Sequence, residues 1–179
     1  ASPALRTHGR RLKVDLCGIE LDNPVGLAAG YDKDCVHLEQ LAAMGFGYVV
    51  GGTVTLHPRP GNPRPRMLRY ESKESLANSL GFPGQGLDRA EARLSAAARS
   101  GLPSPAVVSI SGTEVEDILA CHRRLEPLAS AVEVNISSPN TSGLKVFQQR
   151  DALKDLLERI NEHRVRPLFV KLPPYLHSP

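Results

Sequence analysis

The chain has 179 residues, of which 41% are hydrophobic and 23% are charged, the composition of a globular protein with room for about one domain. Its net charge of +3 and its lack of tryptophan argue against a nucleic-acid-binding surface. No apolar run approaches the roughly 18 residues that a membrane-spanning helix requires.

The first predicted element is a β-hairpin over residues 12–24, because apolar and polar positions alternate on both sides of Gly18. Beyond it, near-continuous apolar runs predict strands at residues 25–30, 48–54, 106–110, 132–137 and 168–172. Helical spacing predicts helices at residues 36–44, 87–99, 114–125 and 152–164. Thr113 is the expected N-cap of the third helix, and a proline-rich loop spans residues 56–66. This alternation indicates a parallel sheet covered by helices.

Polar residues stand on or just after every one of these strands. They are Lys33, Thr53, Ser109, Asn135 and Lys171. Because the carboxyl ends of parallel strands meet at one edge, we expect a single site there. No G-x-G-x-x-G motif opens the first helix, so the pattern favours a (β/α)8 TIM barrel of the α/β class over an open doubly wound sheet.

A complete barrel has eight strands in typically about 250 residues. The sequence supplies an N-terminal β-hairpin and about five of those strands, so the sheet cannot close on itself. We therefore expect residues 1–11 to be the remnant of an N-terminal extension and residues 12–179 to form an incomplete barrel domain. The rest of the barrel is then needed from the same or another chain.

Four segments in this order resemble the dihydroorotate dehydrogenase family. They are GLAAGYDKD at residues 26–34, GTVT at 52–55 with PGNP at 60–63, NSLGF at 78–82 and NISSPNT at 135–141. The resemblance implies an FMN-binding TIM barrel, and so an incomplete FMN-binding domain over residues 12–179. It also implies an enzyme that oxidises dihydroorotate to orotate in the de novo synthesis of the pyrimidine UMP.

The resemblance further implies a role for individual residues. Ser138 matches the catalytic base, and Thr141 and Phe82 match residues that shape its proton relay. The implied substrate-binding residues are Lys33, Asn78, Ser79, Leu80, Gly81, Phe82, Asn135 and Asn140. The implied FMN-binding residues are Ala29, Gly30, Tyr31, Asp32, Lys33, Thr53, Ser109, Asn135 and Lys171. No metal ligands are expected.

Serine at position 138 resembles the quinone-using class of the family, and Arg69 matches an arginine near the quinone path. Ser109 departs from that class and looks more like the soluble one. In the quinone class an N-terminal extension docks on the membrane, which implies a peripheral contact that the present sequence lacks. With no signal peptide and three widely spaced cysteines, the sequence predicts a reducing compartment such as the cytoplasm. The resemblance adds the cytoplasmic face of the inner membrane as an expected location.

Two other interpretations remain open from the residues alone. Lys171 or Lys33 at a strand end could form a Schiff base, which would make the protein a lyase or aldolase barrel. Alternatively, an open five-stranded sheet exposes apolar edges, so the chain would pair with itself or with another chain. We expect this chain alone to be an inactive fragment that holds FMN weakly.

Overall fold

The structure is a computed structural model that describes residues 11–138 and 143–173. Its strands are β1 (Val14–Leu16), β2 (Ile19–Leu21), β3 (Gly26–Asp32), β4 (Tyr48–Val54), β5 (Met67–Tyr70), β6 (Ser75–Asn78), β7 (Ala106–Ile110), β8 (Ala131–Asn135) and β9 (Leu168–Lys171). Its α-helices are α1 (Leu38–Ala42), α2 (Leu87–Ser100), α3 (Val115–Leu125) and α4 (Arg150–Asn161), and its 3₁₀ helices are η2 (Glu71–Lys73), η3 (Glu126–Leu128) and η4 (Leu144–Gln148).

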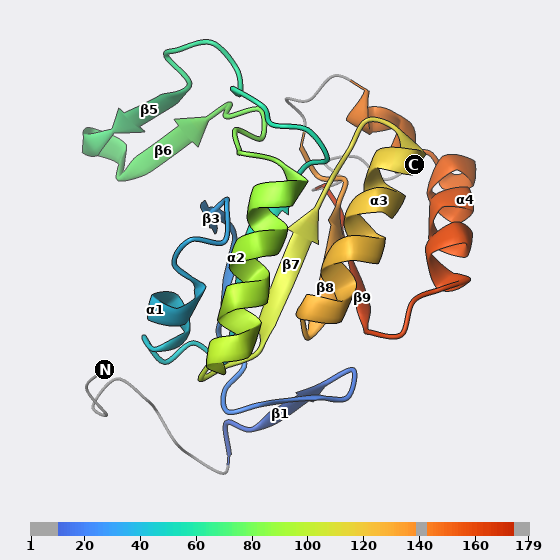
Figure 1. The fold of residues 1–179 in the computed structure, drawn as a ribbon. Helices are drawn as coiled ribbons and strands as arrows, with labels where there is room; N and C mark the ends of the chain where they lie inside the picture. Colours follow the sequence, from blue (N-terminus) through green and yellow to red (C-terminus); the bar gives the residue numbers. More distant parts are fainter. Residues whose placement is uncertain (1–10, 139–142, 174–179) are drawn as a thin grey trace.

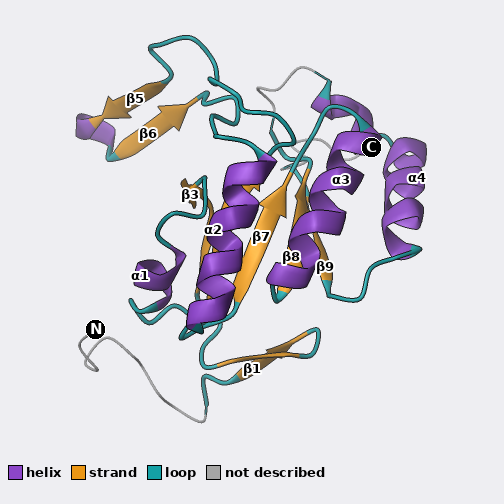
Figure 2. Cartoon of the chain, viewed as in Figure 1, coloured by secondary structure: helices purple, strands orange, loops and turns teal. Residues whose placement is uncertain are grey.

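Five strands form one parallel sheet in the order β3-β4-β7-β8-β9. The four α-helices lie along one face of this sheet (Figure 1). The hairpin β1–β2 lies at the end of the sheet where the strands begin, and the hairpin β5–β6 projects near the end where they finish (Figure 2). The predicted α/β architecture with five parallel barrel strands is confirmed.

The two faces of the sheet are packed differently. On the helix side, α2 buries Leu87, Ala90 and Leu94, the spacing of one helical face. The opposite face carries a smaller cluster around Val50, Val107 and Ala131, against which Ile19 and Phe169 pack, among others. Since Ile19 belongs to β2, the first hairpin closes one end of this second face.

Some local predictions were wrong. The first helix was expected over 36–44 but spans only Leu38–Ala42, because the chain turns before it. Cys35 has a φ of 56°, and the carboxylate of Asp32 accepts the backbone N–H groups of Val36 and His37, both at 2.8 Å.

The predicted N-cap of α3 was also wrong. Glu114 rather than Thr113 holds that position, with extended backbone and no side-chain hydrogen bond to the helix. The hairpin β5–β6 was not predicted at all. Every residue of its two strands is exposed. Because neither strand has a buried face, the sequence lacks the alternation of apolar and polar residues that predicts a half-buried strand.

Candidate active site

A cavity of about 330 Å³ lies at the carboxyl ends of the parallel strands. Its lining comes from the ends of four parallel strands and from the stretch that runs from the last residue of β6 toward α2. These residues are Ala29, Gly30, Lys33, Thr53, Asn78, Leu80, Gly81, Phe82, Pro83, Asn135, Ser137, Ser138 and Lys171. Most of the predicted site residues that fall in the described part of the chain thus surround one cavity.

A buried hydrogen-bonded chain of side chains supports the wall formed by β4 and β8. The amide of Asn135 donates from Nδ2 to Oγ1 of Thr53 at 2.9 Å. The hydroxyls of Thr53 and Ser109 lie 2.9 Å apart and share a hydrogen bond. Ser109 is fully buried and does not line the cavity. It therefore supports the side chain of Thr53 and is not expected to contact a ligand.

The loop that leaves β8 is also fixed by Asn135. Its Oδ1 accepts a hydrogen bond from the backbone N–H of Ser137 at 3.0 Å and from the Ser137 hydroxyl at 2.7 Å. Such a turn is typical of an asparagine followed by a loop. It places Ser137 and then Ser138, which is half-buried, in the cavity wall.

Two lysines contribute the charge of the site. The ammonium of Lys33 donates to the carbonyl of Gly30. Lys171 is half-buried and lies directly beside Asn135 in the register of β8 and β9. Among the described residues that line the cavity there is no carboxylate, so the site favours an anionic or electron-rich ligand.

The segment from Asn78 to Phe82, here called the rim segment, is held from outside the sheet. Asn62 donates from Nδ2 to the backbone oxygen of Ser79 at 3.1 Å and to its hydroxyl at 3.0 Å. Gly81 has a φ of 71°, and a Cβ there would lie 2.4 Å from Oδ1 of Asn62. Only glycine fits this position without displacing Asn62.

Several predicted residues lie elsewhere. Tyr31 is 75% exposed and is absent from the lining, as is Asp32, whose buried carboxylate binds backbone N–H groups. Ser79 faces Asn62, and Arg69 is exposed on β5. Asn140 and Thr141 lie outside the described residues.

The sequence analysis did not single out Ser137 or Pro83 as site residues. The first could have been found from the Asn-x-Ser spacing that forms its turn. No sequence signal marks Pro83, since only the tertiary placement of the rim segment brings it to the cavity.

The other reactive groups of the described chain are not gathered for catalysis. Burial raises the pKa of the Cys35 and Cys121 thiols to about 12 in each case, which makes them poor nucleophiles. No three His, Cys, Asp or Glu side chains come together as metal ligands within residues 11–138 and 143–173. None of the helices in the described ranges has the length and apolar character of a membrane-spanning segment.

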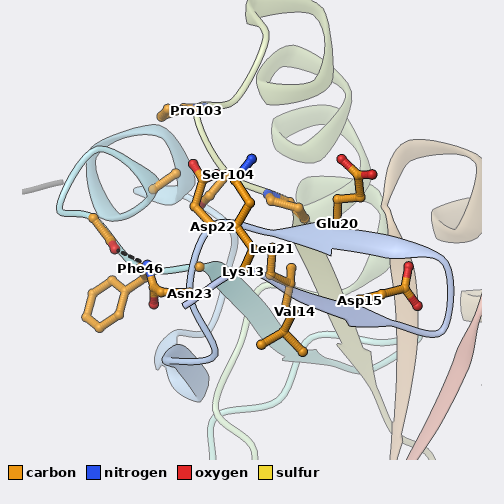
Figure 3. A pocket seen from close by; sticks show the side chains of 14 residues that line it. Lys13, Val14, Asp15, Glu20, Leu21, Asp22, Asn23, Phe46, Pro103 and Ser104 are labelled. Atoms are coloured by element: carbon orange, nitrogen blue, oxygen red, sulfur yellow. Dashed lines mark hydrogen bonds between the residues drawn. The ribbon is translucent and has the colours of Figure 1, made fainter. Parts of the chain in front are cut away.

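A second cavity, of about 380 Å³, lies at the opposite end of the sheet (Figure 3). It is lined by the β1–β2 hairpin and by the loops that lead into β4 and β7. Asn23 bridges two of these parts by donating from Nδ2 to the carbonyl of Gly45 at 3.0 Å. Because active sites of parallel barrels lie at the carboxyl ends of the strands, this cavity is not the candidate active site.

Comparison with known proteins gives a consistent result. The family model described as "Dihydroorotate dehydrogenase" matches residues 11–178. "Dihydroorotate dehydrogenase (quinone)" of Chloroflexus aurantiacus is 44% identical over 93% of this chain and 50% of its own length. The protein of the same name from Thermus thermophilus is 39% identical over 96% of this chain and 52% of its own length.

Solved structures agree with the sequence relatives. A ligand-free DHODH from Eimeria tenella superposes with a TM-score of 0.87 at 32% identity, covering 97% of this chain and 57% of that one. The same organism's DHODH in complex with ferulenol gives a TM-score of 0.85 at 31% identity, with 97% and 55% of the two chains covered. The present chain thus spans about half the length of the relatives that it matches.

Proposed function

The chain belongs to the dihydroorotate dehydrogenase family, and from this we propose that it supplies the substrate side of an enzyme that oxidises dihydroorotate to orotate in pyrimidine (UMP) synthesis. The observation that carries the proposal is the convergence of Lys33, Asn78, Asn135, Ser138 and Lys171 on one cavity. These residues come from separate parts of the chain, and each has a chemistry that this reaction requires.

The family is generally flavin-dependent, and the cofactor that we propose is FMN. Ala29 and Gly30 give the cavity a wall with almost no side chain. Gly30 has a φ of 105°, and no atom lies within 4 Å of the position that a Cβ would take. A flat ring system can therefore approach the backbone there. When bound, FMN would accept a hydride from the substrate, while Lys33 and Lys171 would hold positive charge near an electron-rich ring.

The proposed substrate is an amide-rich heterocycle that carries a carboxylate and becomes flat on oxidation. The amides of Asn78 and Asn135 each offer donors and an acceptor that match the edges of such a ring. We propose that Oγ of Ser138 takes the proton from the ring carbon next to the one that loses the hydride. In this proposal Phe82 and Thr141 shape the proton path, which Phe82 shields from water, and Asn140 binds the substrate.

We propose a quinone as the electron acceptor, because the curated relatives are named as quinone enzymes. Arg69, exposed on the β5–β6 hairpin, would lie beside the path that the quinone takes. A quinone dissolved in the bilayer requires a peripheral membrane contact, which an N-terminal extension would supply. The protein would then work at the cytoplasmic face of the inner membrane.

The sheet seen here has open edges at β3 and β9 within the described residues, whereas a barrel closes with eight strands. We propose that the remaining strands come from the same or another chain. Residues 1–179 alone should then hold FMN weakly and turn over no substrate. Retention of one FMN per chain by residues 1–179 in gel filtration would contradict this part of the proposal.

The decisive experiment is anaerobic mixing of the protein, expressed from its natural reading frame, with dihydroorotate. The proposal expects the absorbance of the oxidised flavin to disappear and to return when a quinone is added. In Ser138→Ala, flavin should remain bound but its reduction should slow by at least about a hundredfold, the contribution of a positioned general base. Undiminished reduction in this variant would remove Ser138 from the mechanism.

The alternative of a Schiff-base lyase has less support. All the relatives named above are dihydroorotate dehydrogenases, and the ammonium of Lys33 is occupied by the carbonyl of Gly30. A colourless protein in which borohydride traps a carbonyl substrate on Lys33 or Lys171 would favour the lyase.

A further inference from the structure

The loop that carries Lys33 is fastened to the segment that follows the rim. Asp34, the next residue after Lys33, accepts the backbone N–H of Gln85 at its carboxylate Oδ1, with a distance of 2.7 Å. Arg93, on helix α2, donates to the backbone oxygen of Asp34 at 3.1 Å and to Oε1 of Gln85 at 2.9 Å. The loop after β3 is thus joined to α2 and to a residue shortly before that helix, which lie 51 to 59 residues further along the chain.

The rim segment is held at both ends by contacts of this kind. At its beginning, Asn62 binds Ser79. After its end, Gly84 pairs with Arg59 through two backbone hydrogen bonds of 2.9 and 3.0 Å, and Gln85 is held by Asp34. Of these contacts, the one from Asp34 comes from the loop that bears a site lysine.

The approach between Asp34 and the segment is close. A Cβ built on Gly84 would lie 3.2 Å from Oδ1 of Asp34, so the glycine lets the carboxylate reach the next N–H group. A hydrogen bond from an N–H to a carboxylate is stronger than one between neutral groups. The contact can therefore fix the spacing between the two parts of the chain that it joins.

We propose that Asp34 is a positioning residue for the substrate: it sets the distance between Lys33 and the rim segment that carries Asn78 and Phe82. The inference rests on the proposed function, in which these groups bind opposite parts of the substrate. Asp34 itself does not line the cavity, so it acts through the backbone of Gln85. Loss of the contact removes none of the groups that bind the substrate, but it lets the distance between Lys33 and the rim segment vary.

The test compares Asp34→Ala with Asp34→Asn in the protein expressed from its natural reading frame. The alanine variant lacks the acceptor, whereas asparagine keeps an oxygen at the same place. We expect Asp34→Ala to raise KM for dihydroorotate by about tenfold, which corresponds to about 1.4 kcal/mol, with kcat and the flavin spectrum unchanged. Asp34→Asn should restore most of the affinity. An effect on kcat alone, or equal losses in both variants, would overturn the proposal.

Two further measurements separate positioning from a general loss of structure. Hydrogen exchange at the Gln85 amide in flavin-free protein should be faster in Asp34→Ala than in Asp34→Asn. Asp15→Ala is the matched control, because Asp15 also accepts a backbone N–H, that of Gly18 at 3.0 Å, but lies at the other end of the sheet. It should leave KM unchanged, and an equal rise in KM there would overturn the proposal.

If Asp34→Ala does not fold, Arg93→Ala tests the proposal in its place. Arg93 lies on α2, and its replacement removes two hydrogen bonds of the same junction. A rise in KM smaller than that expected for Asp34→Ala supports the proposal, and an unchanged KM refutes it. Failure of the wild-type protein to reduce its flavin with dihydroorotate would instead refute the proposed function, and the exchange measurement would still report on the contact.

Discussion

The buried hydroxyl of Thr53 provides a direct test of how the site is supported. It accepts a hydrogen bond from the Asn135 amide and shares one with Ser109, both at 2.9 Å. Thr53→Val keeps the shape of the side chain and removes both interactions. Each hydrogen bond contributes about 1 kcal/mol net, and a buried donor left without a partner costs about 1–3 kcal/mol. We expect the free energy of unfolding to fall by about 2–3 kcal/mol.

Urea unfolding of the flavin-free protein measures this effect without any contribution from cofactor binding. The matched control is Thr55→Val, on the same stretch of chain. Thr55 is also buried, but its hydroxyl donates to the nearby backbone carbonyl of His57, at 2.8 Å, and not to a side chain of another strand. Its replacement should cost only about 1 kcal/mol.

The two variants should also differ in cofactor binding. Thr53→Val leaves Nδ2 of Asn135 without its acceptor, while Ser137 still holds Oδ1. Flavin should therefore dissociate more readily from Thr53→Val, whereas Thr55→Val should retain it. If the two variants lose the same stability and bind flavin equally, the chain from Asn135 to Ser109 does not organise the site.

Three more outcomes follow from the backbone, a histidine and the thiols. Gly52→Ala should destabilise the fold by at least about 2 kcal/mol in urea titrations, because φ is 115° and a Cβ would lie 2.4 Å from the backbone oxygen of Ser109. Burial lowers the pKa of His122, against the opposing effect of Glu126. As the pH falls, the unfolded chain therefore binds a proton at this histidine before the folded chain does. The free energy of unfolding should fall as the pH drops from about 7.5 to 5.5, and this fall should be less steep in His122→Gln than in wild type. A thiol reagent at about pH 8 should modify Cys17, which is exposed, and leave the two buried thiols unmodified until the protein is unfolded.

The sequence predicts the central strands well because each of them is a continuous apolar run that can be recognised without knowledge of the rest of the chain. The expected strands over 48–54 and 106–110 coincide with β4 and β7, which are buried over nearly their whole length. Continuous runs of valine and other apolar residues are typical of strands covered on both faces. The predicted convergence of strand-end residues also follows from local information, since it needs only the direction of the strands.

Tertiary contacts explain what the sequence does not predict. Asp32 stands within a motif that implied a flavin contact, yet its carboxylate binds the N–H groups of Val36 and His37. The rim segment depends on Asn62 and Asp34, which lie 17 and 51 residues from the groups that they bind. No periodicity or spacing in the sequence relates such distant positions.

The strands that carry the site differ in how regularly they pair, and irregular and regular pairing depend on different features of the sequence. The pairing of β3 with β4 shifts between Leu27 and Asp32, and that of β4 with β7 shifts between Gly51 and Val54. Glycines with positive φ lie within both irregular stretches, so the backbone conformation there depends on residues without a side chain. The pairing of β8 with β9 is regular up to Asn135 and Lys171. A slip of one residue between these strands would turn Lys171 away from the cavity, so strand register alone places it beside Asn135.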